Sequence, residues 1–243
     1  MKLLIDIGNS RVKWGVESAG EIEGPYAFAA EADAITEAFE LAWGGLSPAS
    51  VCFCSVSTGN LPEVLSDWSR GAWDVEPVRV RPAASAGPLV CGYQDPDALG
   101  ADRWANLLGA RDLLGATDVV VVDAGTAVTV DALRADGRHL GGAILPGLRA
   151  ARAGLHAAAP ALPAAGGVAG LPAKTTAEGM AAGSLVGLAG AIERVAREVG
   201  NPLEGPAWLL TGGDTDTLRP WLDPGWRHEP LLTLRGLSAA LEN

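Results

Sequence analysis

The chain has 243 residues, of which 48% are hydrophobic and 19% are charged, so it can build a packed core and lacks the composition of a disordered protein. Its formal net charge of −11 disfavours contact with a polyanion, and we therefore expect no nucleic acid partner. No run of about 18 uncharged apolar residues occurs, and the first apolar stretch is too short for a signal sequence. We therefore expect a cytoplasmic protein with no membrane partner.

The first half of the chain alternates strand-like and helix-like segments. Residues 2–7 and 11–17 are short β-prone runs joined by a turn at 8–10, which predicts a hairpin. Residues 82–96 are rich in proline and glycine and are predicted to form a loop. Asn60 is the expected N-cap of a helix. The predicted helices cover residues 31–43, 60–70 and 97–114, and further strands cover 50–56 and 76–81.

The second half begins with the most strand-like segment of the chain. Residues 118–122 include four consecutive valines, a run typical of a fully buried central strand. A turn is predicted at Gly141-Gly142. The remaining predicted strands cover residues 127–133, 143–145 and 207–210, and the predicted helices cover 148–159, 176–198 and 237–242.

Cysteine and histidine do not occur at metal-binding spacings. We interpret the three cysteines as small buried side chains, and we assign no catalytic role to the three histidines. The residues concerned are Cys52, Cys54, Cys91, His139, His156 and His228.

A repeat relates the two halves of the chain. The segments LLIDIGNSRVKWGV and VVVDAGTAVTVDAL align without gaps at an offset of 117 residues, which matches Asp6 with Asp123. Self-similarity of this kind predicts two α/β lobes, residues 1–115 and 116–243, each opening with a hairpin. The alternative is that two unrelated strand–turn–strand segments share the same turn chemistry, because Asp and Gly are ordinary turn residues.

A buried strand that ends in Asp-x-Gly is suited to bind phosphate. The glycine lets a phosphate approach backbone N–H groups, and the carboxylate can hold Mg²⁺, which needs only one or two carboxylates beside phosphate oxygens. Asn9, Ser10 and Thr126 add neutral hydrogen-bond donors. Two such hairpins facing each other would grip the β- and γ-phosphates of ATP. That arrangement favours a kinase, because phosphoryl transfer depends mainly on positioning and electrostatics.

The paired hairpins resemble those of the actin, Hsp70 and sugar-kinase superfamily, and four motifs resemble the type III pantothenate kinases. The motifs are Asp6-Ile7-Gly8-Asn9-x-x-x-Lys13, Gly100-Ala101-Asp102-Arg103 followed by Asn106, Asp123-Ala124-Gly125-Thr126-Ala127-x-Thr129-x-Asp131 and Gly141-Gly142-Ala143-Ile144-Leu145-Pro146-Gly147. The resemblance implies an α/β fold of two ribonuclease H-like lobes, with mixed sheets flanked by helices and an ATP cleft between the lobes. It also implies ATP-dependent phosphorylation of pantothenate, the first step of coenzyme A biosynthesis.

The same resemblance implies a role for individual residues. Asp102 would act as general base on the hydroxyl of pantothenate, and Arg103 would bind the carboxylate or amide end of that substrate. Asp123 would hold a monovalent cation, K⁺ or NH₄⁺. The family is dimeric, so a homodimer is expected, with Thr176 near the subunit interface. The other implied substrate residues are Tyr93, Gly100 and Ala101, and ATP with Mg²⁺ would contact Asp6, Ile7, Gly8, Asn9, Ser10, Arg11, Val12, Lys13 and Thr126.

Simpler interpretations exist for several of these residues. Asp6 can be a turn residue that caps local N–H groups, and Lys13 can be a solvated residue of an edge strand. Asp102 can be a helix-terminal carboxylate paired with Arg103. Tyr93 can be a half-buried packing residue.

The sequence departs from the family pattern in two places. Residues 156–163 are rich in alanine and proline where the family usually has Thr-Ala before Leu-Pro, and Thr175 stands where the family usually has Asn. These departures bear on the shape of the substrate pocket. Three other functions remain as alternatives: a kinase for another small alcohol or sugar, a non-catalytic regulatory accessory factor, and an actin-like or chaperone ATPase. The short chain disfavours the last, and Asp102 beside Arg103 favours an enzyme over a regulator.

Overall fold

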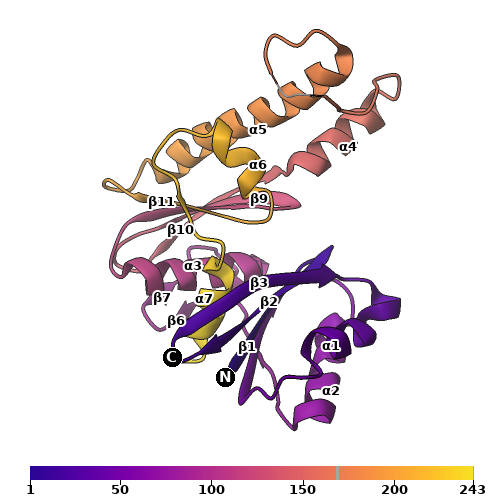
Figure 1. Ribbon diagram of the computed structural model, residues 1–243. Helices are drawn as coiled ribbons and strands as arrows, with labels where there is room; N and C mark the ends of the chain where they lie inside the picture. The colour runs from indigo at the N-terminus through magenta and orange to yellow at the C-terminus, as the bar shows by residue number, and fades with distance from the viewer. Residues whose placement is uncertain (168–169, 243) are drawn as a thin grey trace. The chain divides into compact units, whose positions relative to one another are not determined.

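The computed structural model describes residues 1–167 and 170–242, and these form two compact units (Figure 1). The first unit contains Met1–Ala116, Asp136–His139 and the described residues from Leu231 onward. The second contains Thr117–Ala135 and the described residues of Leu140–Pro230. Each unit is built on one mixed five-stranded sheet with flanking helices, which confirms the predicted α/β fold class. None of the described helices is long and apolar enough to cross a membrane.

The sheet of the first unit has the strand order β3-β2-β1-β4-β5. Strand β1 is central, antiparallel to β2 and parallel to β4, and β3 is antiparallel to β2. The strands are β1 (Lys2–Ile7), β2 (Arg11–Ser18), β3 (Glu21–Ala29), β4 (Ser50–Ser55) and β5 (Val78–Arg79).

Alternate side chains of the central strands point to opposite faces of this sheet, and a layer of helices covers each face. Leu3 and Ile5 pack with Phe39 of α1 and Leu65 of α2, whereas α3 and α7 contact the sheet through β1 and β4. The helices are α1 (Ile35–Trp43), α2 (Leu61–Trp73), α3 (Ala101–Leu114) and α7 (Leu232–Ala240).

The sheet of the second unit has the order β10-β9-β8-β11-β12. Counted from the first strand of each unit, this is the same order as in the first sheet, so the sequence repeat reflects a duplicated architecture rather than shared turn chemistry alone. The predicted buried valine strand is β8, and Val120 and Val122 pack against Leu188 and Ile192 of α5. The elements are β8 (Val119–Ala124), β9 (Ala127–Leu133), β10 (His139–Pro146), β11 (Ala207–Thr211), β12 (Arg227–His228), α4 (Leu148–Ala158), α5 (Thr176–Gly200) and α6 (Thr215–Leu218).

Four local expectations were wrong. Strand β3 was not predicted, because its sequence EIEGPYAFA is polar and contains a Gly-Pro pair that is typical of loops. The expected turn at Gly141-Gly142 lies inside β10, where Gly141 has a φ of +101° within the strand. Helix α7 begins at Leu232 rather than at residue 237. The loop at 82–96 contains a small hairpin of β6 (Ser85–Ala86) and β7 (Leu89–Val90).

Candidate active site

The first hairpin buries the carboxylate of Asp6 at the end of β1. In the sheet, Asp6 is paired with Lys13 on β2 and with Cys54 on β4. The Lys13 Nζ lies 3.9 Å from Asp6 Oδ2, and the Cys54 thiol donates to Asp6 Oδ1 at 3.5 Å. Because β3 covers the outer side of β2, Lys13 does not lie on an edge strand, and its side chain is 34% exposed. The two phosphate-site candidates of this hairpin are therefore held together by the sheet.

The turn of the first hairpin presents backbone to solvent. The Gly8 N–H donates to the Arg11 carbonyl at 3.0 Å, which closes the turn, and Asn9 and Ser10 are exposed. Ile7 and Val12 are instead fully buried in the core. Of the predicted ATP-binding residues, these two can therefore contribute only through their backbone.

Cys54 connects two of the predicted carboxylates. Its thiol is buried, and its pKa is raised well above the usual value by burial and then by the negative charges of Asp6 and Asp102. The thiol therefore stays protonated and can donate to Asp6, and both carboxylates lie close enough to act on it. The sequence correctly indicated burial of this cysteine but gave no sign of its polar contact, because strand neighbours are not visible in a local pattern.

Asp102 lies half-buried in the first turn of α3. Its Oδ1 accepts a hydrogen bond from the Arg103 backbone N–H at 2.7 Å. A Cβ atom at the helix N-cap, Gly100, would lie only 2.6 Å from that same oxygen. Glycine at position 100 therefore leaves the space that the Asp102 carboxylate occupies.

Arg103 and Tyr93, both predicted to bind substrate, are in direct contact. The Arg103 side chain is buried, its Nη1 donates to the Tyr93 hydroxyl at 2.8 Å, and its guanidinium carbon lies 5.4 Å from the centroid of the Tyr93 ring. The Tyr93 ring in turn stacks on His139, with centroids 5.8 Å apart. His139 was assigned no role from the sequence, and its position behind Tyr93 is visible only in the fold.

Helix α7 supports the helix that carries Asp102 and Arg103. A Cβ at Gly236 would lie 1.8 Å from the Ala105 carbonyl oxygen, and one at Gly109 would lie 2.2 Å from the Leu232 carbonyl oxygen. The backbones of α3 and α7 therefore touch, which requires glycine at both crossing points. The Thr233 hydroxyl also donates to the buried Asn106 side chain at 2.7 Å.

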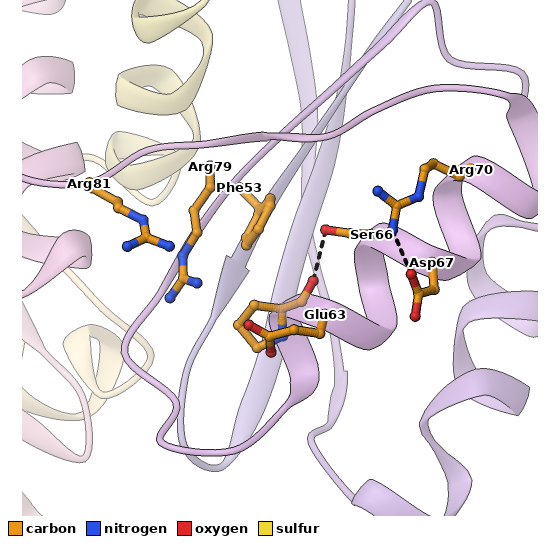
Figure 2. Close-up of a pocket in the computed structure, with 8 residues that line it drawn as sticks. Phe53, Glu63, Ser66, Asp67, Arg70, Arg79 and Arg81 are labelled. Atoms are coloured by element: carbon orange, nitrogen blue, oxygen red, sulfur yellow. Dashed lines mark hydrogen bonds and ion pairs between the residues drawn. The ribbon is translucent and has the colours of Figure 1, made fainter.

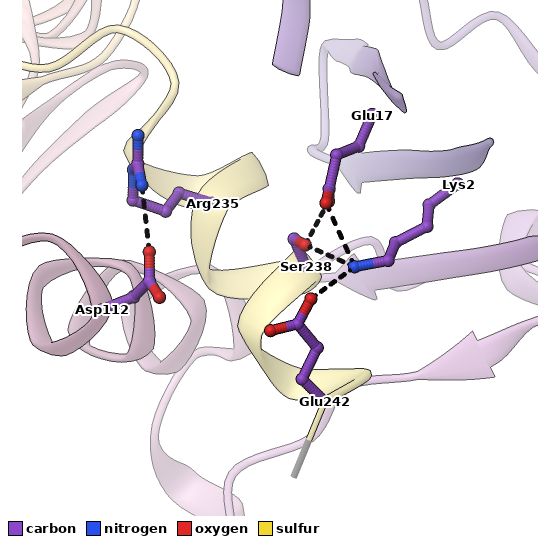
Figure 3. A network of polar contacts seen from close by, with 6 residues as sticks. All are labelled: Lys2, Glu17, Asp112, Arg235, Ser238 and Glu242. Carbon is purple, nitrogen blue, oxygen red and sulfur yellow. Dashed lines mark hydrogen bonds and ion pairs between the residues drawn. The ribbon is translucent and has the colours of Figure 1, made fainter. Parts of the chain in front are cut away.

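Polar side chains fix α7 on two sides, as Figure 3 shows. Lys2 donates to Glu17 at 3.1 Å, to Ser238 at 3.1 Å and to Glu242 at 2.7 Å. Ser238 also donates to Glu17. Arg235 pairs with Asp112 of α3 at 3.0 Å. These contacts join α7 to β1, β2 and α3.

The second hairpin places Asp123 near the end of β8. It is paired with Thr129 on β9 and with Thr211 on β11. Gly212 follows with a φ of +100°, and a Cβ there would lie 2.5 Å from Asp123 Oδ1. Thr126 is exposed in the turn, and the Gly147 N–H donates to its carbonyl at 3.2 Å. Two glycines thus bring neighbouring backbone close to this hairpin.

Thr176 is exposed at the first position of α5, directly after a capping box. Thr175 accepts from the Glu178 N–H at 3.2 Å, and Glu178 accepts from the Thr175 N–H at 3.1 Å. Since Asn and Thr both serve as N-caps, the departure from the family pattern at position 175 preserves the helix start.

Within residues 1–167 and 170–242, no group of three or more His, Cys, Asp or Glu side chains is arranged to hold a metal ion. Magnesium bound with ATP does not need such a group, because phosphate oxygens and water supply most of its ligands. The buried Asp6 carboxylate, next to an exposed backbone turn, fits that requirement.

Solved structures define the class of fold. The chain superposes on a ROK family glucokinase from Streptomyces griseus, solved with glucose and AMPPNP, with a TM-score of 0.57, 15% identity and coverage of 99% of this chain and 98% of the glucokinase. A protein from Campylobacter jejuni described as a Baf family transcriptional activator gives a TM-score of 0.64 and 21% identity, over 99% of this chain and 97% of the other. The chain therefore shares the overall fold of these two proteins.

Sequence comparison narrows this class to one family. The family model described as type III pantothenate kinase matches residues 2–198. The curated type III pantothenate kinase from Halorhodospira halophila is 39% identical over 245 residues, which cover 98% of this chain and 96% of that protein. The one from Methylibium petroleiphilum is also 39% identical over 245 residues, which cover 96% of this chain and 91% of that protein. The chain belongs to the type III pantothenate kinase family.

Proposed function

We propose that this chain transfers the γ-phosphoryl group of ATP to pantothenate, giving ADP and 4′-phosphopantothenate, the first step of coenzyme A biosynthesis. The observation that carries this proposal is the match to the type III pantothenate kinase family over residues 2–198, in a chain that buries Asp6 beside Lys13 and Cys54 at its first hairpin. Asp102 is suited to the substrate hydroxyl, and Asp6 to the phosphates. Because ATP is made and used in the cytoplasm, we place the reaction there.

The first hairpin is proposed to bind the phosphates of ATP. The turn exposes Asn9 and Ser10, whose backbone and side chains are suited to contact phosphate, and Lys13 supplies a positive charge beside Asp6. Magnesium, when bound, neutralises charge on the phosphates. Asp6 would hold the metal, directly or through water, from a position that Cys54 fixes by its hydrogen bond.

Asp102 is proposed as the general base. Its contact with the Arg103 N–H fixes one carboxylate oxygen, so the group is oriented before substrate arrives. In a loose transition state the hydroxyl proton is transferred late, and orientation of the attacking oxygen matters at least as much as basicity. The stack of Arg103 on Tyr93 would hold the carboxylate or amide end of pantothenate, because a guanidinium group suits planar oxygen pairs.

The remaining proposals concern the second unit and the assembly. Asp123 would hold a monovalent cation, K⁺ or NH₄⁺, and the exposed Thr126 would contact ATP. Thr176 is exposed at the start of α5, where it would complete a pantothenate site near the interface of a homodimer. Gly100 and Ala101 would line the same substrate site.

The test is an ADP-release assay with purified protein, ATP, Mg²⁺ and K⁺, with pantothenate, with glucose and without an acceptor. We expect ADP release that depends on pantothenate, together with a product whose mass equals pantothenate plus one phosphoryl group. Release that depends on glucose would assign the chain to a different substrate. Absence of release with either acceptor, from a protein that still binds ATP, would favour a regulatory protein.

A further inference from the structure

A pocket of about 380 Å³ lies on the first unit, between β4, β5 and the beginning of α2 (Figure 2). None of the residues assigned above to ATP, metal or pantothenate lines it. Its walls include Phe53 of β4, Glu63 of α2, and three arginines, Arg70, Arg79 and Arg81. A volume of this size admits a small metabolite.

The three arginines are not equivalent. Arg70 pairs with Asp67 at 2.5 Å and with Glu76 at 2.8 Å, so its charge is already balanced. Among the described residues, no carboxylate lies within ion-pairing distance of Arg79 or Arg81. These two guanidinium groups therefore remain available to an anion.

Arg79 is the last residue of β5, and Arg81 follows two residues later, with the buried Val80 between them. Figure 2 shows their guanidinium groups next to each other at the pocket. The Arg79 guanidinium carbon lies 5.8 Å from the centroid of the Phe53 ring, which is its neighbour in the sheet register. The aromatic ring thus fixes one of the two cations.

Arg79 and Arg81 place positive charge at this pocket, although the whole protein is negatively charged. Burial and the positive charge of Arg81 both lower the pKa of Arg79, and Glu63 offsets this only in part. Two adjacent cations repel each other, although the chain carries a net charge of −11. A bound anion with two negative charges would relieve this repulsion.

We propose that the pocket binds a small phosphate-bearing metabolite, with the phosphate held by Arg79 and Arg81. A phosphate dianion balances both guanidinium groups, whereas a single carboxylate balances one. This site goes beyond the proposed kinase reaction and does not depend on it. Its ligand is distinct from the ATP expected at the first hairpin.

The test uses the full chain and inorganic pyrophosphate as the probe, followed by NMR. We expect saturable shifts of the arginine side-chain Nε–Hε signals of Arg79 and Arg81, assigned from Arg79→Lys and Arg81→Lys variants. Binding at the hairpin would instead move the backbone amides of residues 8–11, so the two sites are read separately. Malonate, a dicarboxylate of similar charge to a phosphate dianion, is the competing probe.

The variant Arg79→Gln/Arg81→Gln should weaken pyrophosphate binding at the pocket by about tenfold or more, because each charge-assisted contact is lost. The matched control is Arg194→Gln, which removes an exposed arginine that pairs with Glu198 on α5 and should leave binding unchanged. If the double variant does not fold, as judged by circular dichroism, the exposed Arg81→Gln alone serves. Absence of shifts at both arginines, equal affinity in variant and wild type, or tighter binding of malonate than of pyrophosphate would overturn the proposal.

Discussion

The two hairpins begin from the same sequence pattern but provide different chemical environments. In the first, Asp6 is buried and lies beside a lysine amino group and a thiol. In the second, Asp123 is half-buried, and its paired neighbours are Thr129 and Thr211. A duplicated backbone therefore supports two carboxylates whose strand neighbours differ: a lysine and a cysteine beside Asp6, and two threonines beside Asp123.

The turns of the two hairpins differ in length by one residue, and this changes which residue lies opposite each aspartate. The Gly8 N–H bonds to the carbonyl of Arg11, three residues further on, whereas the Gly125 N–H bonds to that of Ala127, two residues further on, each at 3.0 Å. As a result, Lys13 faces Asp6, but Thr129 faces Asp123, although the gapless alignment matches Lys13 with Val130. A shift of one residue in register exchanges the faces of a strand, so Val130, the residue aligned with Lys13, lies opposite Val122 rather than Asp123.

The largest expected effect tests whether the first unit supplies the chemistry. Asp102→Asn should lower turnover by roughly 10²–10⁴-fold, because the amide cannot accept the hydroxyl proton. The fold should be unchanged, since the amide oxygen can still accept from the Arg103 N–H. Steady-state ADP release and the thermal midpoint are the measurements. Turnover close to that of wild type would remove Asp102 from the role of base.

Parallel substitution of the two hairpin carboxylates tests the contrast directly. Asp6→Asn should lower turnover by about 10²-fold and weaken the response to Mg²⁺, because it removes the charged group beside the phosphates. Asp123→Asn should leave the Mg²⁺ response intact and reduce activation by K⁺ by about tenfold. Titrations of Mg²⁺ and K⁺ on both variants give the comparison. Equal loss of both responses in both variants, or full wild-type activity in sodium-only buffer, would contradict the division of roles.

The support beneath Asp102 can be tested through stability. Gly236→Ala should destabilise the protein by about 3 kcal/mol, because the new methyl group would overlap the Ala105 carbonyl where α7 touches α3. Denaturant midpoints give the change in the free energy of unfolding. Gly71→Ala is the matched control in α2, where a Cβ meets nothing within 4 Å, and it should be neutral or stabilising. An equal effect of the two substitutions would show that the close helix contact is unimportant.

The smallest expected effect concerns pH and the second unit. Backbone N–H groups of Glu204 and Ala135, at 2.8 and 2.6 Å, lower the pKa of Asp118 below its usual value. The ionised form is therefore favoured in the folded state, and its stabilisation is present above about pH 4 and is lost as the pH falls through the lowered pKa. Asp118→Asn should cost about 1 kcal/mol or less at pH 7 and flatten the acid limb of a stability-versus-pH curve. An unchanged acid limb would rule out this contribution.

The sequence predicted the α/β fold class because both hairpins have strong local signals. A β-prone run, Asp-x-Gly and a second β-prone run were sufficient to predict β1–β2 and β8–β9. The sequence predicts substrate contacts for Arg103 and Tyr93, and the structure brings these two residues into direct contact. These features depend on residues that are close in sequence or on a repeated pattern.

What the sequence could not predict depends on contacts between distant residues. Cys54 touches Asp6 only because β4 pairs with β1, and His139 lies behind Tyr93 only after the chain has folded. The difference in turn length was invisible because the alignment needs no gap. The polar edge strand β3 was missed because exposure removes the apolar alternation by which strands are recognised.

The position of α7 has a consequence for synthesis on the ribosome. Residues 1–116 leave the exit tunnel well before Leu232–Ala240, yet the backbone of α3 at Ala105 and Gly109 packs closely against that later helix. A nascent chain can present residues 1–116 while the helix bearing Asp102 still lacks its partner. Most of the first unit is thus synthesised early, but its last helix, α7, is synthesised at the end of translation. A truncated translation product would carry the whole Gly-Ala-Asp-Arg motif but would lack α7, which packs against the helix bearing that motif.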